Sequence, residues 1–193
     1  MDPKMPSPHP FKEKLLQIIR ERSYREGEFT LASGKKSSFY LDVKETALHP
    51  EGAFLIGTLA VELFQREDLH PYAVGGLTMG ADPLATAISL AAFANGMKIP
   101  AFLVRKEPKG HGTLSSIEGA KTYPKGASLL VLEDTATTGG SALKAVDRLL
   151  EAGFKVEAVL TVVDREEGAR EAVEARGLKF FSLSSLREIR SGS

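Results

Sequence analysis

The stretch from Leu129 to Leu143 contains the residues whose types and spacing point most directly to chemistry. An apolar run up to Leu132 predicts a short, buried parallel strand, and the adjacent carboxylates Glu133 and Asp134 follow it. A helix with periodic apolar residues is expected to begin near Ala142. The intervening residues are small, hydroxyl-bearing or glycine: Thr135, Ala136, Thr137, Thr138, Gly139, Gly140 and Ser141.

This strand, turn and helix predict a site for an anion. Backbone N–H groups converge where the strand ends and the helix begins, and the positive end of the helix dipole strengthens the site. Thr137, Thr138 and Ser141 add hydroxyl donors for phosphate oxygens, whereas the two carboxylates would repel a phosphate unless they hold sugar hydroxyls or a metal ion. We therefore expect a phosphorylated ribose ligand, with Mg²⁺ as a companion. The alternative is an ordinary strand–turn–helix corner with two solvated acids.

A second stretch, Arg105 to Thr113, is rich in basic side chains and follows the expected strand Ala101 to Val104. Pro108 and the glycines on both sides of His111 indicate a mobile lid rather than a packed segment. Arginine offers a planar fork for phosphate oxygens and lysine a point charge, so the loop suits a diphosphate that must be held and then released. The alternative is a solvated basic loop. The candidate side chains are Arg105, Lys106, Lys109 and His111.

A third stretch, Phe29 to Val43, has extended character on both sides of Ser33-Gly34, which predicts a hairpin. Taken alone, it is a hairpin with an exposed lysine pair, Lys35 and Lys36, and with Phe39 and Tyr40 as packing residues.

The composition predicts a globular protein of one domain spanning residues 1–193. The chain has 42% hydrophobic and 26% charged residues, with 25 basic and 25 acidic side chains. This balance gives no argument for a nucleic-acid partner or an anionic membrane. Cysteine is absent, which excludes disulfides and thiol catalysis. The proline-rich segment Met1 to Pro10 is expected to be a loose arm, and the chain is expected to be cytoplasmic.

Helical and extended segments alternate along the chain, which predicts an α/β fold with a mainly parallel sheet. In such sheets ligands bind beyond the carboxyl ends of the strands, where Glu133 follows its strand. The helix over Pro83–Asn95 is alanine-rich and is expected to be closely packed. The expected helices are Phe11–Arg22, Glu51–Gln65, Pro83–Asn95, Ala142–Ala152 and Glu166–Ala175. The expected strands are Tyr72–Gly76, Ala101–Val104, Ser128–Glu133, Val156–Val163 and the edge strand Lys179–Ser182.

The order of an apolar run, Glu133-Asp134 and Thr137-Thr138-Gly139-Gly140 resembles the diphosphoribose-binding motif of the type I phosphoribosyltransferases. Phe29-Thr-Leu-x-Ser-Gly-Lys-x-Ser37, followed by aromatic residues, resembles the N-terminal signature of the orotate phosphoribosyltransferases within that family. With Arg-Lys-x-x-Lys-x-His at residues 105–111, the resemblance covers the chain from about Phe11 to Glu167. It implies the type I phosphoribosyltransferase fold, a mainly parallel sheet flanked by helices with a small N-terminal hood over about residues 11–45.

The resemblance also implies an activity. Such enzymes transfer ribosyl 5-phosphate from 5-phosphoribosyl 1-diphosphate (PRPP) to orotate, giving orotidine 5'-monophosphate and diphosphate in pyrimidine (UMP) biosynthesis. They need Mg²⁺, bound mainly through PRPP, and act as cytoplasmic homodimers whose lid loop reaches into the neighbouring subunit's site.

The resemblance assigns roles to residues at matching positions. The diphosphate would be held by Arg105, Lys106, Lys109 and His111, and flanked by the loop from Gly76 to Asp82. The ribose hydroxyls would bind Glu133 and Asp134, and the 5-phosphate would bind residues 135–141. Catalysis would rest on Lys109, His111 and Asp134. Orotate would contact Thr137, Arg165, Tyr40 and Leu41.

Two positions depart from the family pattern. Ala32 stands where many relatives carry a lysine that touches PRPP, and Gly80 replaces the lysine of their Ala-Tyr-Lys-Gly loop. Lys35 or Lys36 is the substitute cation that the sequence offers.

Three other interpretations are open at this point. A purine phosphoribosyltransferase would share the Glu133-Asp134 turn, although the Phe29 hairpin and Arg165 argue against it. A non-catalytic regulator that senses PRPP could dispense with the basic loop, which is present here. An unrelated α/β protein would require three ordered motifs to coincide.

Overall fold

The computed structural model describes residues 9–30, 34, 36–107 and 116–192. Its centre is a six-stranded sheet with the order β5-β4-β3-β6-β7-β8. Every neighbouring pair is parallel except β4 and β5. The strands are β3 (Ala73–Leu77), β4 (Ala101–Val104), β5 (Ile117–Glu118), β6 (Ser128–Ala136), β7 (Lys155–Asp164) and β8 (Lys179–Ser185). The expected α/β fold with a mainly parallel sheet is confirmed, and β8 is an edge strand as predicted.

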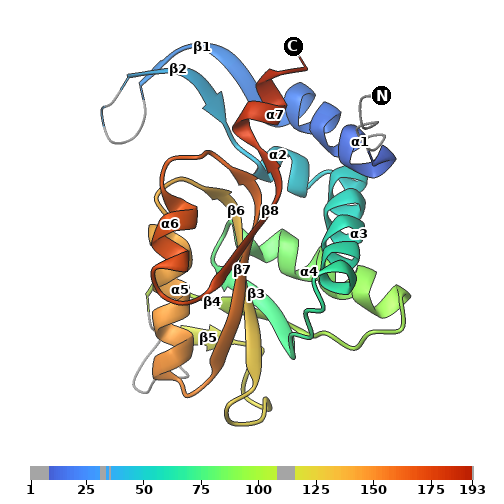
Figure 1. The fold of residues 1–193 in the computed structure, drawn as a ribbon, viewed down its shortest axis with the longest axis vertical. Helices are drawn as coiled ribbons and strands as arrows, with labels where there is room; N and C mark the ends of the chain where they lie inside the picture. Colours follow the sequence, from blue (N-terminus) through green and yellow to red (C-terminus); the bar gives the residue numbers. More distant parts are fainter. Residues whose placement is uncertain (1–8, 31–33, 35, 108–115, 193) are drawn as a thin grey trace, which may run out of the picture.

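Helices cover both faces of this sheet (Figure 1). α3 (Pro50–Arg66) and α4 (Ala81–Ala94) pack on one face, and α5 (Gly140–Glu151) and α6 (Ala169–Glu174) pack on the other. Alternate residues of β6 serve the two layers: Leu130 and Leu132 belong to the core under α3 and α4, and Leu129 and Val131 to the core under α5. A strand buried on both faces needs a continuous apolar sequence, which explains the run that precedes Glu133.

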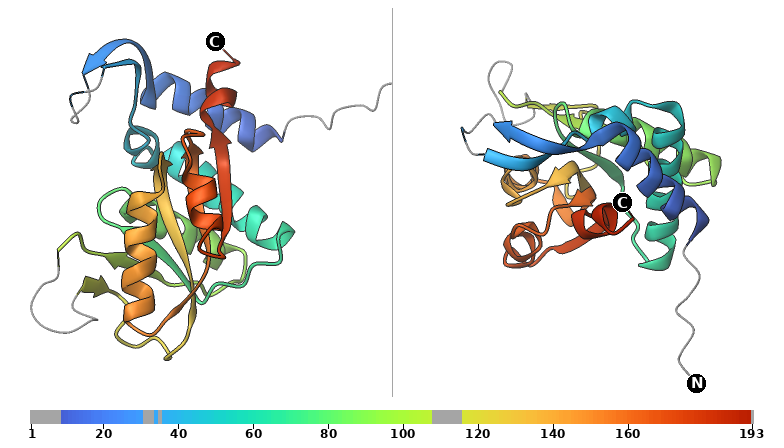
Figure 2. Two further views of the ribbon diagram at one scale, coloured as in Figure 1. Left: turned by 60° about the vertical axis from the view of Figure 1, so that its left-hand side comes forward. Right: turned by 90° about the horizontal axis from the view of Figure 1, so that it is seen from above.

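A hood lies beyond the carboxyl ends of the strands (Figure 2). It consists of α1 (Pro10–Ile18), the π-helical turn η1 (Ile19–Ser23), and the antiparallel pair β1 (Tyr24–Thr30) and β2 (Lys36–Leu41). The short helix α2 (Lys44–Ala47) leads from the hairpin to α3. Arg20 fixes the hood to the C-terminal helix α7 (Leu186–Arg190), because its guanidinium donates to the carbonyls of Glu188 at 2.9 Å and Ile189 at 2.8 Å.

Several predicted boundaries were wrong, for physical reasons. Pro10, assigned to the arm, begins α1, because proline is well suited to a first helical turn. The first hairpin strand begins at Tyr24 rather than Phe29, since Tyr24 pairs with Leu41. β6 continues past Glu133 to Ala136, because β7 pairs with it along this length. The short elements α2, β5 and α7 were not predicted. Residues 1–8 of the predicted arm lie outside the described residues.

The prediction that the alanine-rich helix is closely packed holds for only one face of α4. Ala81, Leu84, Ala85, Ile88 and Ala92 are buried against the sheet and α3. On the outer face, Leu90 and Phe93 are 66% and 69% exposed, and Phe54 of the adjacent α3 is 60% exposed. We call Phe54, Leu90 and Phe93 the outer apolar patch. None of the described helices is long and apolar enough to cross a membrane.

Candidate functional site

A pocket lies at the carboxyl ends of β3 and β6, the position where parallel sheets bind ligands. Its lining consists of Lys44, Leu77, Thr78, Met79, Gly80, Lys106, Glu133, Asp134 and Ser141. Of the residues predicted to bind substrates or take part in catalysis, Lys106, Glu133, Asp134 and Ser141 come together here. The loop predicted to flank the diphosphate contributes Leu77, Thr78, Met79 and Gly80. The other predicted binding residues that the structure describes lie outside this lining: Tyr40, Leu41, Arg105, Thr135, Ala136, Thr137, Thr138, Gly139, Gly140 and Arg165. Lys109, His111 and Ala32 lie outside the described residues.

The two carboxylates lie within β6, not in the turn that follows it. Glu133 and Thr135 pair with Thr161 and Val163 of β7, so this part of the strand is held on one side by a long neighbour. The Asp134 side chain is 14% exposed and accepts a hydrogen bond from the Thr135 backbone N–H at 2.8 Å. Position in a strand fixes both carboxylates more tightly than a turn would, which suits groups that must orient a sugar.

Burial raises the pKa of Glu133 from its ordinary value of 4.5 to about 8. A hydrogen bond with Asp134 and the charge of that carboxylate also raise this pKa, while the ammonium of Lys106 lowers it. Glu133 is thus protonated at neutral pH in the free protein and can donate one hydrogen bond as well as accept others.

The turn after β6 has the geometry expected of an anion site. Gly139 has φ of 79°, in the left-handed region that favours glycine, and it precedes the first residue of α5. No side chain caps this helix N-terminus among the described residues, and the first turn of α5 contains no acidic residue. The free N–H groups at the N-terminus of α5 are therefore directed toward the turn that precedes the helix. Ser141, in the first turn of α5, lines the pocket. The helix begins at Gly140 rather than near Ala142, which brings its dipole closer to the turn.

Two lysines bring positive charge to the pocket lining. Lys106, from the end of β4, was predicted, and its backbone carbonyl accepts a hydrogen bond of 2.6 Å from Arg148 of α5. Lys44, from α2, was missed. Its Nζ lies 2.7 Å from Asp42 Oδ1 and 3.7 Å from Asp134 Oδ2. The Asp-x-Lys spacing after the hairpin is the only signal in the sequence that could have pointed to Lys44.

The loop between β3 and α4 is in close contact with Asp134. A Cβ atom added at Gly80 would lie 2.7 Å from Asp134 Oδ1, closer than real Cβ contacts. The preceding Thr78–Met79 peptide bond is cis. Position 80 therefore accommodates glycine while Asp134 keeps its place, and a side chain there would displace the carboxylate.

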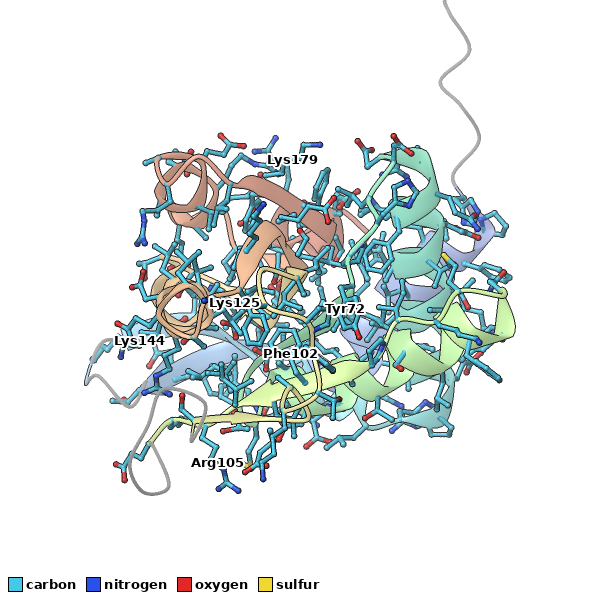
Figure 3. All side chains as sticks on the ribbon, turned by 90° about the horizontal axis from the view of Figure 1, so that it is seen from below. Tyr72, Phe102, Arg105, Lys125, Lys144 and Lys179 are labelled. Atoms are coloured by element: carbon cyan, nitrogen blue, oxygen red, sulfur yellow. The ribbon has the colours of Figure 1, made fainter. Side chains whose placement is uncertain are left out.

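Arg105 is not directed into the pocket. Its guanidinium Nη2 forms an ion pair of 2.7 Å with Glu118 of β5. Arg105 projects from the periphery of the molecule, whereas Phe102 of the same segment lies in the interior (Figure 3). The described part of the basic loop thus contributes Lys106 to the pocket and leaves Arg105 beside it.

The residues predicted to contact orotate lie on the hood and at the end of β7. The Arg165 guanidinium carbon stacks 4.8 Å from the ring centroid of Phe39, and its Nη2 pairs with Glu167 at 2.6 Å. Tyr40 is partly exposed and its ring packs 5.7 Å from that of Phe29, centroid to centroid. Phe39 is buried, as expected for a packing residue, so the hairpin turns Tyr40 outward and Phe39 toward Arg165.

Among the described residues, no group of three or more acidic, histidine or cysteine side chains is arranged to hold a metal ion. The pocket does offer Glu133 and Asp134 side by side. Mg²⁺ often binds through one or two carboxylates together with substrate phosphates, and this donor set is compatible with that mode.

Comparison with known proteins gives concordant matches. Residues 42–179 match the phosphoribosyl transferase domain family. The orotate phosphoribosyltransferase of Bradyrhizobium sp. (strain ORS 278) is 50% identical over 179 residues, which is 92% of this chain and 96% of that protein. The crystal structure of Mycobacterium tuberculosis H37Rv orotate phosphoribosyltransferase with Fe(III) dicitrate superposes with a TM-score of 0.83 at 44% identity, covering 93% of this chain and 99% of that one. Its complex with PRPP gives 0.77 at 40% identity, covering 94% and 99%.

The raised pKa of Glu133 predicts a pH-dependent stability. Between pH 4.5 and about 8 the folded protein keeps a proton that the unfolded chain has released, so wild-type stability falls as the pH rises. Glu133→Gln removes this loss, so its stability relative to wild type should increase toward pH 8, by on the order of a few kcal/mol. Urea unfolding between pH 5 and 8 measures the difference, with the exposed Glu151→Gln as control. A Glu133→Gln difference that stays constant with pH would contradict the assignment.

Proposed function

The chain belongs to the orotate phosphoribosyltransferase family, whose reaction is transfer of ribosyl 5-phosphate from PRPP to orotate, and we propose which of its side chains perform each part of that reaction. The observation that supports the proposal most strongly is the pocket itself. It joins two carboxyl groups fixed in a strand, two lysines and a helix N-terminus that no described side chain caps, at the carboxyl end of a parallel sheet. This combination matches a ligand with sugar hydroxyls, a phosphate and a diphosphate.

We assign the 5-phosphate to the turn of residues 135–141, where the helix dipole of α5 and the hydroxyls of Thr137, Thr138 and Ser141 can bind its oxygens. The ribose hydroxyls are assigned to Glu133 and Asp134. A protonated Glu133 can donate to one sugar oxygen, while Asp134 accepts from a sugar hydroxyl. The strand pairing of β6 with β7 keeps both carboxyl groups in position for this recognition.

Displacement at the anomeric carbon passes through an oxocarbenium-like state, in which the bond to diphosphate breaks as orotate nitrogen approaches. The attacking ring nitrogen loses its proton as the new C–N bond forms, and the departing diphosphate oxygen can accept that proton, so the reaction needs no strong general base from the protein. Catalysis rests on positioning and on neutralising the departing diphosphate. We assign this neutralisation to Lys106 and, on the resemblance, to Arg105, Lys109 and His111, with Lys109, His111 and Asp134 as the catalytic residues. Closure of the basic loop would exclude water, which otherwise hydrolyses PRPP.

Mg²⁺ is the proposed cofactor. Glu133 and Asp134 are the pocket carboxylates that would lie nearest to it, with most of its ligands supplied by PRPP oxygens. When bound, the ion would offset the negative charge that develops on the diphosphate.

Orotate is assigned to the space between the hood and the end of β7. Arg165 would pair with its carboxylate, Thr137 would contact the ring, and Tyr40 with Leu41 would cover it. The stacking of Arg165 on Phe39 supports this assignment, because it couples the base-binding arginine to the hairpin.

We also propose a homodimer that packs through the outer apolar patch. Isolated exposed apolar residues are ordinary, but Phe54, Leu90 and Phe93 are large and lie on adjacent helices. Met79, 69% exposed, lies at the other end of α4 and also lines the pocket. A second copy seated along α4 would therefore lie next to the site, which suits a basic loop that reaches into the partner.

Mixing the protein with orotate, PRPP and Mg²⁺ should cause rapid loss of orotate absorbance, while adenine, hypoxanthine and uracil should not react. Asp134→Asn, nearly identical in shape, should lower kcat/KM by about 100-fold or more because a sugar hydroxyl loses its charged acceptor. Turnover of a purine would preserve the chemistry and reject the base assignment, and PRPP binding without turnover would favour a regulator.

Arg165→Ala should raise the KM for orotate at least about tenfold with a much smaller effect on the KM for PRPP, because a charged contact to the orotate carboxylate is lost. Arg190→Ala is the matched control, since Arg190 stacks on the same Phe39 ring at 4.5 Å. The control should affect stability without an orotate-specific change. Equal effects of Arg165→Ala on both KM values would remove Arg165 from the base site.

Phe93→Glu should convert the dimer to a monomer, because a carboxylate in an apolar interface is costly to desolvate. Light scattering on a sizing column should give twice the chain mass of 20.8 kDa for wild type and the single chain mass for the variant. Leu150→Glu, at an exposed leucine of α5 on the other side of the sheet, should remain dimeric. A monomeric wild type, or dissociation by Leu150→Glu alone, would refute this interface.

A further inference from the structure

Lys44 is a cation of the pocket to which neither the motifs nor the proposed mechanism gives a role. It lies at the start of α2, where the hood joins the rest of the chain. It lines the same pocket as Lys106, Glu133 and Asp134, and its side chain is 38% exposed, so a ligand can reach it.

Lys44 is held in place by the hood rather than by the sheet. Its Nζ pairs with Asp42 Oδ1 at 2.7 Å, and the same oxygen accepts a hydrogen bond of 3.1 Å from the Lys44 backbone N–H. The side-chain hydrogen bond with Asp42 raises the pKa of Lys44, and the charge of Asp134 adds to the shift, so the ammonium stays protonated over the range in which enzymes work. The 3.7 Å separation from Asp134 Oδ2 is an ionic contact that is too long for a hydrogen bond. An ammonium has three donors, so Lys44 has donors for a phosphate oxygen besides its bond to Asp42.

The charge balance of the pocket favours such a contact. Its described lining contains two carboxyl groups and two ammonium groups, and a diphosphate adds several negative charges to this space. Lys44 and Lys106 are the two cations of that described lining. An anion at a partly buried site is stabilised by each nearby counter-charge, so Lys44 adds to the neutralisation assigned to Lys106, the basic loop and Mg²⁺.

The loop between β3 and α4 has no cation at position 80, because glycine stands there in place of the lysine of many relatives. A Cβ atom at this position would lie 2.7 Å from Asp134 Oδ1 and 2.8 Å from its carboxyl carbon, so the carboxylate would have to shift to admit a side chain. Lys44 Nζ lies 3.7 Å from Oδ2 of the same carboxylate. The hood thus places a positive charge beside Asp134, where the loop has none at position 80.

We propose that Lys44 binds the diphosphate of PRPP directly, so that the hood contributes to the leaving-group site as well as to base recognition. This inference rests on the proposed function and assigns one further substrate contact within it. The alternative role is structural: Lys44 would only tie the hood to Asp134 and would never touch the substrate.

The test compares wild type with Lys44→Met and Lys44→Arg, and with Lys125→Met, an exposed lysine in the loop between β5 and β6 (Figure 3). Lys44→Met should raise the KM for PRPP and weaken calorimetric binding of inorganic diphosphate with Mg²⁺ by about 10- to 100-fold, the loss expected for a charged hydrogen bond. Binding of ribose 5-phosphate and the KM for orotate should change less than about twofold, and Lys44→Arg should recover part of the loss. Lys125→Met should match wild type.

Each other outcome overturns the proposal. An unchanged diphosphate affinity would remove Lys44 from the leaving-group site, and equal weakening of ribose 5-phosphate and diphosphate would show that it acts only by holding Asp134. Lys36→Met tests the exposed hairpin lysine in the same assay, and a PRPP defect there instead of at position 44 would transfer the role to Lys36. If Lys44→Met lowers the melting temperature strongly, the affinities for diphosphate and for ribose 5-phosphate are compared in Lys44→Gln and Lys44→Arg instead. A wild type that neither binds nor turns over PRPP would refute the proposed function itself, whereas an active wild type with an unaffected Lys44→Met refutes this inference alone.

Discussion

The burial of two adjacent carboxyl groups in β6 is the constraint on which the rest of the site depends. Negative charge inside a sheet is costly unless it is neutralised or paired, and the protein does both. Glu133 keeps a proton, as its pKa of about 8 shows, and Asp134 accepts from the Thr135 N–H and faces the ammonium of Lys44. Gly80 completes the arrangement because it leaves space for the Asp134 carboxylate. The free pocket is therefore already organised around the groups that the sugar will contact.

The molecule divides substrate recognition between two layers of structure. The carboxyl ends of β3 and β6, with the N-terminus of α5, provide the donors and acceptors for phosphoribosyl groups. The hood provides an aromatic ring, Phe39, on which two arginines stack: Arg165, directly after β7, and Arg190 of α7. Because Lys44 belongs to the hood yet approaches Asp134 of the sheet, the two layers meet at the leaving-group end of the pocket.

Much of this could be predicted from local patterns, and the rest depended on contacts between distant residues. The apolar run before Glu133 and the small residues after it are local signals, and they correctly indicated a strand, a turn and a helix. The predicted length of β6 was too short, because pairing with β7 extends the strand beyond the apolar run. Lys44 was missed because its partner Asp134 is far away in the sequence, and no pattern around residue 44 shows where the hood will lie. The outer apolar patch was missed because alanine spacing suggests burial on every side, whereas Leu90 and Phe93 face outward.

The clamp between Arg20 and α7 has a consequence for how the protein is made. Arg20 donates to the carbonyl of Ile189, a residue 169 positions later in the chain, and Arg190 donates to the hydroxyl of Tyr24. On the ribosome, the segments that form the hood emerge before the sheet, and the helix that fastens them emerges after it. Contacts of such long sequence separation also form late in refolding, because the chain must lose the entropy of closing a large loop before the contact can stabilise it. The hood therefore stays unfastened while β6 and its carboxylates are made, and α7 completes the cover after them.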